Sequence, residues 1–254
     1  MAEHARTFND DAVQGKPKPF CETPTATAIF ALADWCLNNR RMGLLIGEPG
    51  VGKTTALRHF HAKRVTAHLV TMNPTVRSLN PALAHIASHL GSYSSGRARE
   101  NRTAIVSRLK NDDLHRRGRA PILLLDESQH LTDETLDTLR TIHDEADIGI
   151  LLCGNRDFRT RFNNSRAGFG QVTSRIGMRL ILDQPTTGDV DAICQFYGVN
   201  AEAARSVLRK VAERDGGLRK VHDTINMANS LAGDGAILSA DHLKDATVML
   251  EGRV

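Results

Sequence analysis

The stretch Gly47-Glu48-Pro49-Gly50-Val51-Gly52-Lys53-Thr54 decides the fold, and it directly follows the apolar run Leu44-Leu45-Ile46. It has the pattern G-x-x-x-x-G-K-T of a phosphate-binding loop between a buried strand and a helix. Its glycines let successive backbone N–H groups turn toward a polyphosphate, and the helix that follows presents its positive N-terminal end. A glycine-rich turn without a ligand is the alternative interpretation. The complete motif with these flanks favours a nucleotide-binding site.

Each polar residue of this motif has an expected task. Lys53 supplies a mobile positive charge for the β- and γ-phosphates, and the hydroxyl of Thr54 is an oxygen ligand for Mg²⁺. Thr55 lies one residue further into the helix, near the expected α-phosphate. The predicted nucleotide-binding residues are therefore Gly47, Glu48, Pro49, Gly50, Val51, Gly52, Lys53, Thr54 and Thr55.

Length and composition limit the class of protein. A chain of 254 residues with 41% hydrophobic content can bury one substantial core and a small second one. No apolar run approaches the roughly 20 residues that cross a bilayer, and the N-terminus lacks the apolar segment of a signal peptide. We therefore expect a cytoplasmic protein with no membrane partner. The cysteines Cys21, Cys36, Cys153 and Cys194 are scattered, which favours buried thiols over a zinc site or disulfides.

Positive charge is concentrated in one segment, although the net charge is only +4 and the pI is near 9.0. Such a segment is either a solvated face or a contact for a polyanion, and charge alone does not choose between them. Aromatic residues make up only 4% of the chain, so few side chains are available to stack on nucleic acid bases. The basic residues of the segment are Arg97, Arg99, Arg102, Arg108, Lys110, Arg116, Arg117 and Arg119.

Strand and helix signals alternate along most of the chain. Continuous apolar runs of the kind buried in a parallel sheet predict five strands, at residues 43–46, 65–72, 122–125, 148–153 and 179–182. Helices are expected from Pro24, after a Thr23 cap, and at residues 54–64, 80–90, 103–114 and 132–145. Residues 91–102 are rich in Ser, Gly and Arg and predict a loop. The alternation predicts an α/β fold with a five-stranded parallel sheet flanked by helices.

The strand signals cease at Pro185. Helices are expected at residues 189–196, 201–214, 218–229 and 240–249, separated by glycines. The predicted domains are a flexible arm at residues 1–22, an α/β nucleotide-binding core at 23–184 and a small α-helical lid domain at 185–254.

Two carboxylates follow the third predicted strand. Asp126 and Glu127 would lie at the carboxyl end of the sheet, where ligands bind in open α/β folds and where the phosphate-binding loop also lies. We expect Asp126 to hold Mg²⁺ together with Thr54, and Glu127 to orient and polarise the attacking water. Adjacent acids at an exposed strand end are the alternative, which the motif upstream disfavours.

Four further residues are candidates for the site. Asn155 follows the fourth strand and could donate to the γ-phosphate or the water, although a turn residue after Gly154 would look the same. Arg175 and Arg179 precede or begin the fifth strand, where an arginine would project toward a neighbouring subunit. Arg219 opens a helix of the small domain and could swing over the nucleotide as that domain closes.

With these residues placed, the chain resembles the AAA+ ATPases over about residues 24–254. The resemblance implies ATP as the nucleotide, Asn155 as sensor 1, Arg219 as sensor 2, and Arg175 as an arginine finger acting in trans, with Arg179 as the alternative. Within AAA+, the runs at residues 36–43 and 172–180 look like those of transposition regulators of the MuB, TniB and TnsC type. One departure is that phage MuB has an extra N-terminal DNA-binding domain, whereas this chain has a short arm.

This resemblance implies an ATPase that oligomerises as a filament on duplex DNA, marks target sites, and recruits a transposase that stimulates hydrolysis. The expected partners are double-stranded DNA, the transposase and further copies of the chain. We expect the DNA contacts to include Arg77, Arg97, Arg99 and Arg102, with Arg205, Arg209, Lys210 and Lys220 as the next place to look.

Two other classes of function stay open. An assembly ATPase resembling the ExeA type would have a protein client and no DNA role, although that family usually carries a membrane segment and a wall-binding domain. A small-molecule kinase could use the same loop, but Glu127 next to Asp126 and the helical tail argue against it.

Overall fold

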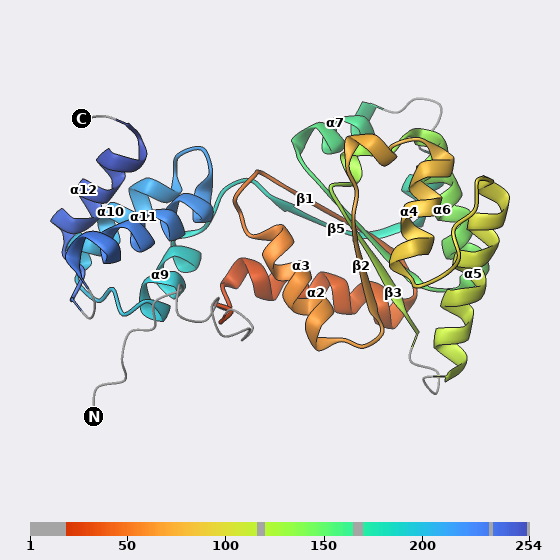
Figure 1. Ribbon diagram of the computed structural model, residues 1–254, viewed down its shortest axis with the longest axis horizontal. Helices are drawn as coiled ribbons and strands as arrows, with labels where there is room; N and C mark the ends of the chain where they lie inside the picture. The colour runs from red at the N-terminus through yellow and green to blue at the C-terminus, as the bar shows by residue number, and fades with distance from the viewer. Residues whose placement is uncertain (1–18, 116–119, 165–169, 234–235, 253–254) are drawn as a thin grey trace. The chain divides into compact units, whose positions relative to one another are not determined.

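The computed structural model describes residues 19–115, 120–164, 170–233 and 236–252. The chain forms two compact units (Figure 1). The sheet unit holds Ala28–Gly47 and Lys53–Leu182. The helical unit holds residues 19–27, the short segment Glu48–Gly52, and the described chain from Asp183 onward.

A parallel sheet of five strands forms the centre of the sheet unit, as the sequence predicts. The strand order is β2-β3-β4-β1-β5, and every neighbouring pair is parallel. Every residue of β1, β3 and β4 is buried, which explains why these strands are continuous apolar runs. The strands are β1 (Met42–Gly47), β2 (Ala67–Thr71), β3 (Ile122–Asp126), β4 (Gly149–Gly154) and β5 (Ile176–Leu182).

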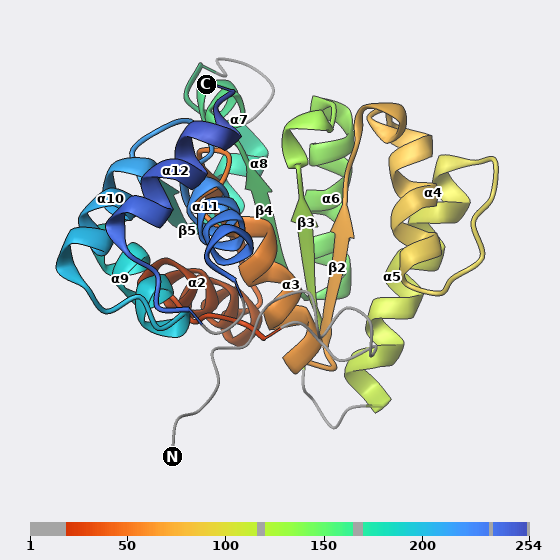
Figure 2. The same cartoon turned by 60° about the vertical axis from the view of Figure 1, so that its left-hand side comes forward.

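Helices cover both faces of this sheet (Figures 1 and 2). One face packs on α4, α5 and α6, and alternate residues such as Leu44, Leu123 and Leu152 join that core. The other face carries α2 and α3, and α2 approaches so closely that a Cβ on Gly149 would lie 2.6 Å from the carbonyl oxygen of Cys36. The elements are α2 (Pro24–Asn39), α3 (Lys53–Lys63), η1 (Pro74–Val76), α4 (Leu79–His89), α5 (Ala98–His115), η2 (Ser128–His130), α6 (Asp133–Ala146), α7 (Arg156–Asn164) and α8 (Gly170–Arg175).

Helix α5 starts earlier than expected, so the predicted loop over residues 98–102 is wrong. The cause is Asn101, which is fully buried. Its Oδ1 accepts from Ser95 N at 2.6 Å, while its Nδ2 donates to Ser95 O and to Asn80 Oδ1, each at 2.9 Å. These bonds satisfy the backbone N–H and C=O groups of Ser95 in the turn before the helix, so α5 begins at Ala98. Arg99 and Arg102 therefore lie on a helix rather than in a loop.

Strand β5 also starts earlier than expected. It begins at Ile176, with Ile176 opposite Met42 of β1, so Arg179 lies inside the strand and not at its start. This start requires a glycine at position 177, because the Cβ of any other residue would lie 2.4 Å from the Trp35 ring. The short helix α8 ends at Arg175, immediately before the strand.

The helical unit contains four helices within its described residues, α9 (Thr187–Phe196), α10 (Glu202–Ala212), α11 (Gly217–Ala232) and α12 (Ala240–Leu250). Asp189 is fully buried and accepts hydrogen bonds from the N–H and hydroxyl groups of both Thr25 and Thr186, at 2.7–2.8 Å. Burial opposes ionisation of this carboxyl, but the bonds from Thr25 and Thr186 outweigh it and hold the Asp189 pKa below its ordinary value. Thr25 therefore belongs to this unit.

None of the helices in the described parts of the chain combines the length and apolar character needed to cross a lipid bilayer.

Candidate active site

Lys53 is the first residue of α3 and is buried. Its Nζ donates to the carbonyl oxygen of Gly47, the last residue of β1, at 2.6 Å. The ammonium is thus held where the phosphate-binding loop leaves the sheet. A buried lysine at this point supplies the positive charge that the motif requires for a polyphosphate.

Thr54 and Asp126 meet as the sequence predicts. The Thr54 hydroxyl donates to Asp126 Oδ2 at 2.7 Å, and Asp126 Oδ1 accepts from the backbone N–H of Glu127 at 3.0 Å. Asp126 is only 1% exposed. A hydroxyl and a carboxylate are hard oxygen donors that suit Mg²⁺, which usually takes one or two protein ligands and completes its shell with phosphate and water. No group of three or more His, Cys, Asp or Glu side chains that could hold a metal ion occurs in the described parts of the chain.

Glu127 has an unusual backbone conformation and a partner that the sequence interpretation missed. Its φ of 57° and ψ of 35° are left-handed, which is uncommon for a residue with a side chain. Its Oε2 accepts a hydrogen bond from Nε2 of Gln129, two residues along in η2. The spacing i, i+2 gives no helix-face signal, so only the turn geometry reveals this pair.

Arg161 of α7 holds the same segment and was also missed. Its Nη1 donates to the Gln129 carbonyl oxygen and its Nη2 to the Leu131 carbonyl oxygen, both at 2.9 Å. It also forms an ion pair with Asp133 at 2.6 Å, and its guanidinium lies 5.7 Å from the centre of the Phe158 ring. Arg161 therefore ties α7 to the chain that follows β3.

Asn155 follows β4 and immediately precedes α7. Its Oδ1 accepts from the backbone N–H of Phe158 at 3.1 Å, which is the bond of a helix N-cap. No partner for its Nδ2 occurs among the residues that the structure describes, so the amide N–H₂ can still donate to a ligand. Both interpretations of Asn155, turn residue and ligand donor, are compatible with this geometry.

The two finger candidates differ in their contacts. Arg175 binds Asp144 of α6 through two parallel hydrogen bonds, Nε to Oδ1 at 2.8 Å and Nη2 to Oδ2 at 3.1 Å. This contact with Arg175 holds the Asp144 pKa below its ordinary value. Arg179 is exposed on the edge strand β5, and no carboxylate within the described ranges pairs with it.

The four arginines expected to contact DNA fall into two groups. Arg77 and Arg99 are exposed, and neither side chain has an ion pair within the part of the chain described. Arg97 pairs with Glu100 at 3.1 Å, and Arg102 binds Thr141 and Glu145 of α6. The Arg77 carbonyl oxygen also accepts from the Thr132 N–H at 3.2 Å, which links the loop after β2 to the segment after β3.

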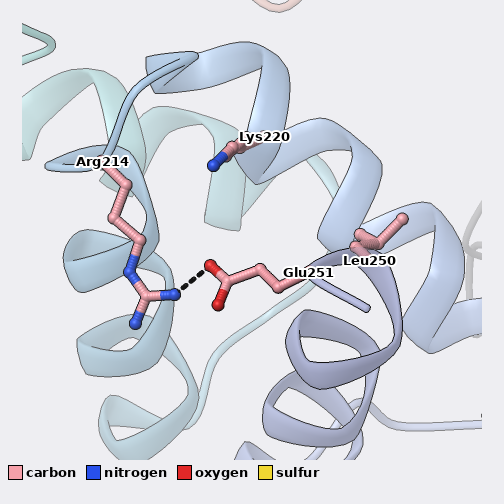
Figure 3. Close-up of a pocket in the computed structure, with 4 residues that line it drawn as sticks. All are labelled: Arg214, Lys220, Leu250 and Glu251. Atoms are coloured by element: carbon pink, nitrogen blue, oxygen red, sulfur yellow. Dashed lines mark hydrogen bonds and ion pairs between the residues drawn. The ribbon is translucent and has the colours of Figure 1, made fainter. Parts of the chain in front are cut away.

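The helical unit carries Arg219 on the first turn of α11, with its side chain exposed. The second set of candidate DNA residues is mostly engaged there. Arg205 donates to the Val199 carbonyl oxygen, and Arg209 pairs with Asp191 and Glu202, while Lys210 is exposed. Lys220 lines an open pocket of about 570 Å³ with Arg214, Leu250 and Glu251, in which Arg214 and Glu251 form an ion pair (Figure 3).

The sheet order, the phosphate-binding loop and the Thr54–Asp126 pair define a P-loop nucleotide-binding protein. Residues 37–162 match the family described as AAA domain, and residues 174–250 match Mu B transposition protein, C terminal. The chain therefore joins an AAA domain to a C-terminal domain of the Mu B transposition protein type. The ATPase activity expected from the sequence is thereby confirmed.

Two similar relatives come from Mu-like phages. The ATP-dependent target DNA activator B of Escherichia phage Mu is 29% identical over 240 residues, covering 92% of this chain and 75% of the relative. The Mu-like prophage FluMu DNA transposition protein B of Haemophilus influenzae is 29% identical over 214 residues, covering 83% and 72%.

Solved structures confirm the fold. The ORC2 protein of Aeropyrum pernix, in ADPNP and ADP complexes, has a TM-score of 0.66 at 22% identity, over 91% of this chain and 69% of that chain. The Cdc6p structure from Pyrobaculum aerophilum has a TM-score of 0.64 at 18% identity, over 94% and 71%.

Proposed function

We propose that this protein is an ATP-dependent DNA-binding ATPase that assembles on duplex DNA and activates target sites for a transposase. The observation that carries this proposal is the match to relatives named target DNA activator along 92% of the chain. The contact between Thr54 and Asp126 supports the ATP-dependent part. Because the target would be DNA, we propose that the protein acts in the cytoplasm.

In this proposal ATP binds with Mg²⁺. Lys53 would neutralise the β- and γ-phosphates, and Thr54 and Asp126 would hold the metal, which supplies charge neutralisation at the reacting phosphate. Glu127 would orient the water, and Asn155 would donate through Nδ2 to the γ-phosphate or that water. Arg219 would act as sensor 2, the part that the AAA+ resemblance gives it.

The DNA contact would be made through the phosphate backbone. An exposed arginine with no carboxylate beside it can bind a phosphate without breaking an existing interaction, whereas an arginine in an ion pair must first break that pair. This comparison favours Arg77 and Arg99 over Arg97 and Arg102. Few aromatic residues are available for stacking, so recognition would depend weakly on sequence.

Assembly would complete the site. Either Arg179, inside β5, or Arg175, directly before β5, would reach the γ-phosphate of a neighbouring copy as an arginine finger in trans. The exposed position of Arg179 supports it over Arg175, whose guanidinium is held by Asp144. The transposase would be the partner that stimulates hydrolysis on the assembled lattice.

Duplex binding with and without a non-hydrolysable ATP analogue tests this function. We expect the analogue to strengthen binding, because assembly multiplies modest contacts along one lattice. The affinity should be nearly equal for unrelated duplex sequences. An absence of duplex binding in both conditions, together with measurable ATP hydrolysis, would overturn the DNA role and favour an assembly ATPase with a protein client.

A further inference from the structure

The segment after β3 fixes Glu127 at two points. Its backbone N–H donates to Asp126 Oδ1 at 3.0 Å, and its side-chain Oε2 accepts from Gln129 Nε2. The left-handed backbone of Glu127 starts the turn that brings Gln129 back to it. A glutamate in this conformation keeps its place only when its surroundings determine it.

The amide of Gln129 has one defined orientation. Its Oε1 is buried and has no hydrogen-bond partner among the described residues. Rotating the amide by half a turn would place Oε1 against the Glu127 carboxylate, so that two acceptors would face each other. The donor bond to Glu127 therefore decides the orientation, even though it leaves Oε1 unsatisfied. A bond to an ionised carboxylate is strong enough to do this.

The main chain of Gln129 is fixed from α7. Arg161 donates to the carbonyl oxygens of Gln129 and Leu131, both at 2.9 Å. Its planar fork suits two acceptors at a fixed separation, which an ammonium would not reproduce. Ser128 adds a bond from Oγ to the Leu125 carbonyl oxygen at 2.8 Å. The turn that carries Gln129 is thus attached to both α7 and β3.

We propose that Gln129 is a positioning residue for ATP hydrolysis: its Nε2–H holds the Glu127 carboxylate in the orientation from which that carboxylate polarises the attacking water, and Arg161 holds Gln129 in place. The inference rests on the proposed role of Glu127. Gln129 touches neither phosphate nor water in this account. Orientation of a catalytic group contributes to kcat more than to substrate binding, so the two parameters should separate.

The test is steady-state ATP hydrolysis by the full chain with Mg²⁺ and duplex DNA. We expect Gln129→Leu to lower kcat about 10-fold with KM for ATP within about 2-fold, because orientation is lost while the phosphate site is intact. Gln129→Glu has the same shape but repels Glu127, so it should lower kcat further. Arg161→Lys should give a smaller loss. Gln195→Leu changes an exposed glutamine of α9 and should leave both parameters unchanged.

A double variant separates positioning from mere structural support. In the Glu127→Gln background, adding Gln129→Leu should cause no further loss of kcat, because Gln129 acts only through Glu127. A further 10-fold loss would overturn the inference. A rise in kcat for Gln129→Leu would also overturn it, because the hydrogen bond from Gln129 to Glu127 would then slow hydrolysis. Normal turnover by Gln129→Leu with slow turnover by Glu127→Gln would overturn the role of Gln129 alone. Wild-type turnover by Glu127→Gln would instead overturn the proposed role of Glu127.

Discussion

The guanidinium of Arg175 forms two parallel hydrogen bonds with the Asp144 carboxylate, at 2.8 and 3.1 Å, while Arg179, four residues later, is exposed. An arginine in such a pair must leave its carboxylate before it can serve a neighbouring subunit. We therefore propose Arg179 rather than Arg175 as the residue that would act in trans.

We predict that Arg179→Ala lowers DNA-stimulated hydrolysis about 10³-fold, since a missing finger removes charge stabilisation from the transition state. Arg175→Ala, the matched control, should change the rate far less. Mixing provides the check: Lys53→Ala subunits, which keep Arg179, should restore hydrolysis to Arg179→Ala subunits. Failure of this rescue, with activity that stays flat on dilution, would argue against action in trans.

The phosphate site predicts a divergence between two variants. Lys53→Ala should abolish ATP binding, because Lys53 is the cation of the motif, whereas Glu127→Gln should bind ATP and hydrolyse it slowly. A fluorescent ATP analogue measures binding, and phosphate release measures turnover. Equal loss of binding in both variants would show that Glu127 has a structural role at the nucleotide.

The exposed arginines predict a change in salt dependence. Each phosphate contact contributes about −0.9 to the slope of log K against log salt on duplex DNA, so replacing Arg77 and Arg99 with alanine should reduce the slope by about 1.8. Arg97→Ala with Arg102→Ala removes equal charge from paired arginines and should change it less. An unchanged slope for Arg77 and Arg99 would direct attention to Lys210 and the helical unit.

The phosphate-binding loop also predicts a difference in stability. Within the helical unit, a Cβ on Gly50 would lie 1.9 Å from the Gly216 carbonyl oxygen, whereas one on Gly52 would meet no atom nearer than 3.9 Å. Both glycines have a positive φ, so the backbone strain is shared. Gly50→Ala should therefore be less stable than Gly52→Ala by about 1–3 kcal/mol of overpacking. Thermal unfolding without nucleotide measures this, and equal midpoints would contradict it.

The low pKa of Asp189 predicts an acid-sensitive helical unit. Its folded pKa lies below the unfolded value near 3.8, so its ionised form stabilises the fold above that pH, and the stabilisation is lost as the pH falls through the folded pKa. Asp189→Asn should show a weaker fall in the free energy of unfolding below about pH 4. Denaturant titrations across this range measure it. Parallel curves for the two proteins would rule Asp189 out.

The sequence predicted the sheet and the Thr54–Asp126 contact because both depend on local patterns: apolar runs, a loop motif and carboxylates at a strand end. The contacts of Gln129 and Arg161 could not be predicted in this way. They depend on the left-handed turn at Glu127 and on α7, a helix whose start is fixed by Asn155. The start of α5 was misjudged for a similar reason, since buried Asn101 organises it through contacts distant in sequence.

The hydrogen bond from Thr132 N–H to the Arg77 carbonyl oxygen links a candidate DNA contact to the segment that carries Glu127. Only the short stretch from Ser128 to Leu131 separates Thr132 from Glu127, and Arg161 grips that stretch near its middle and its end. A displacement of the loop at Arg77 must be absorbed within this tether or passed to Glu127. Free-energy coupling between two ligands is reciprocal. If duplex DNA binds at Arg77, as proposed, this link would couple the two affinities: duplex binding would change the affinity for nucleotide, and nucleotide would change the affinity for duplex by the same factor.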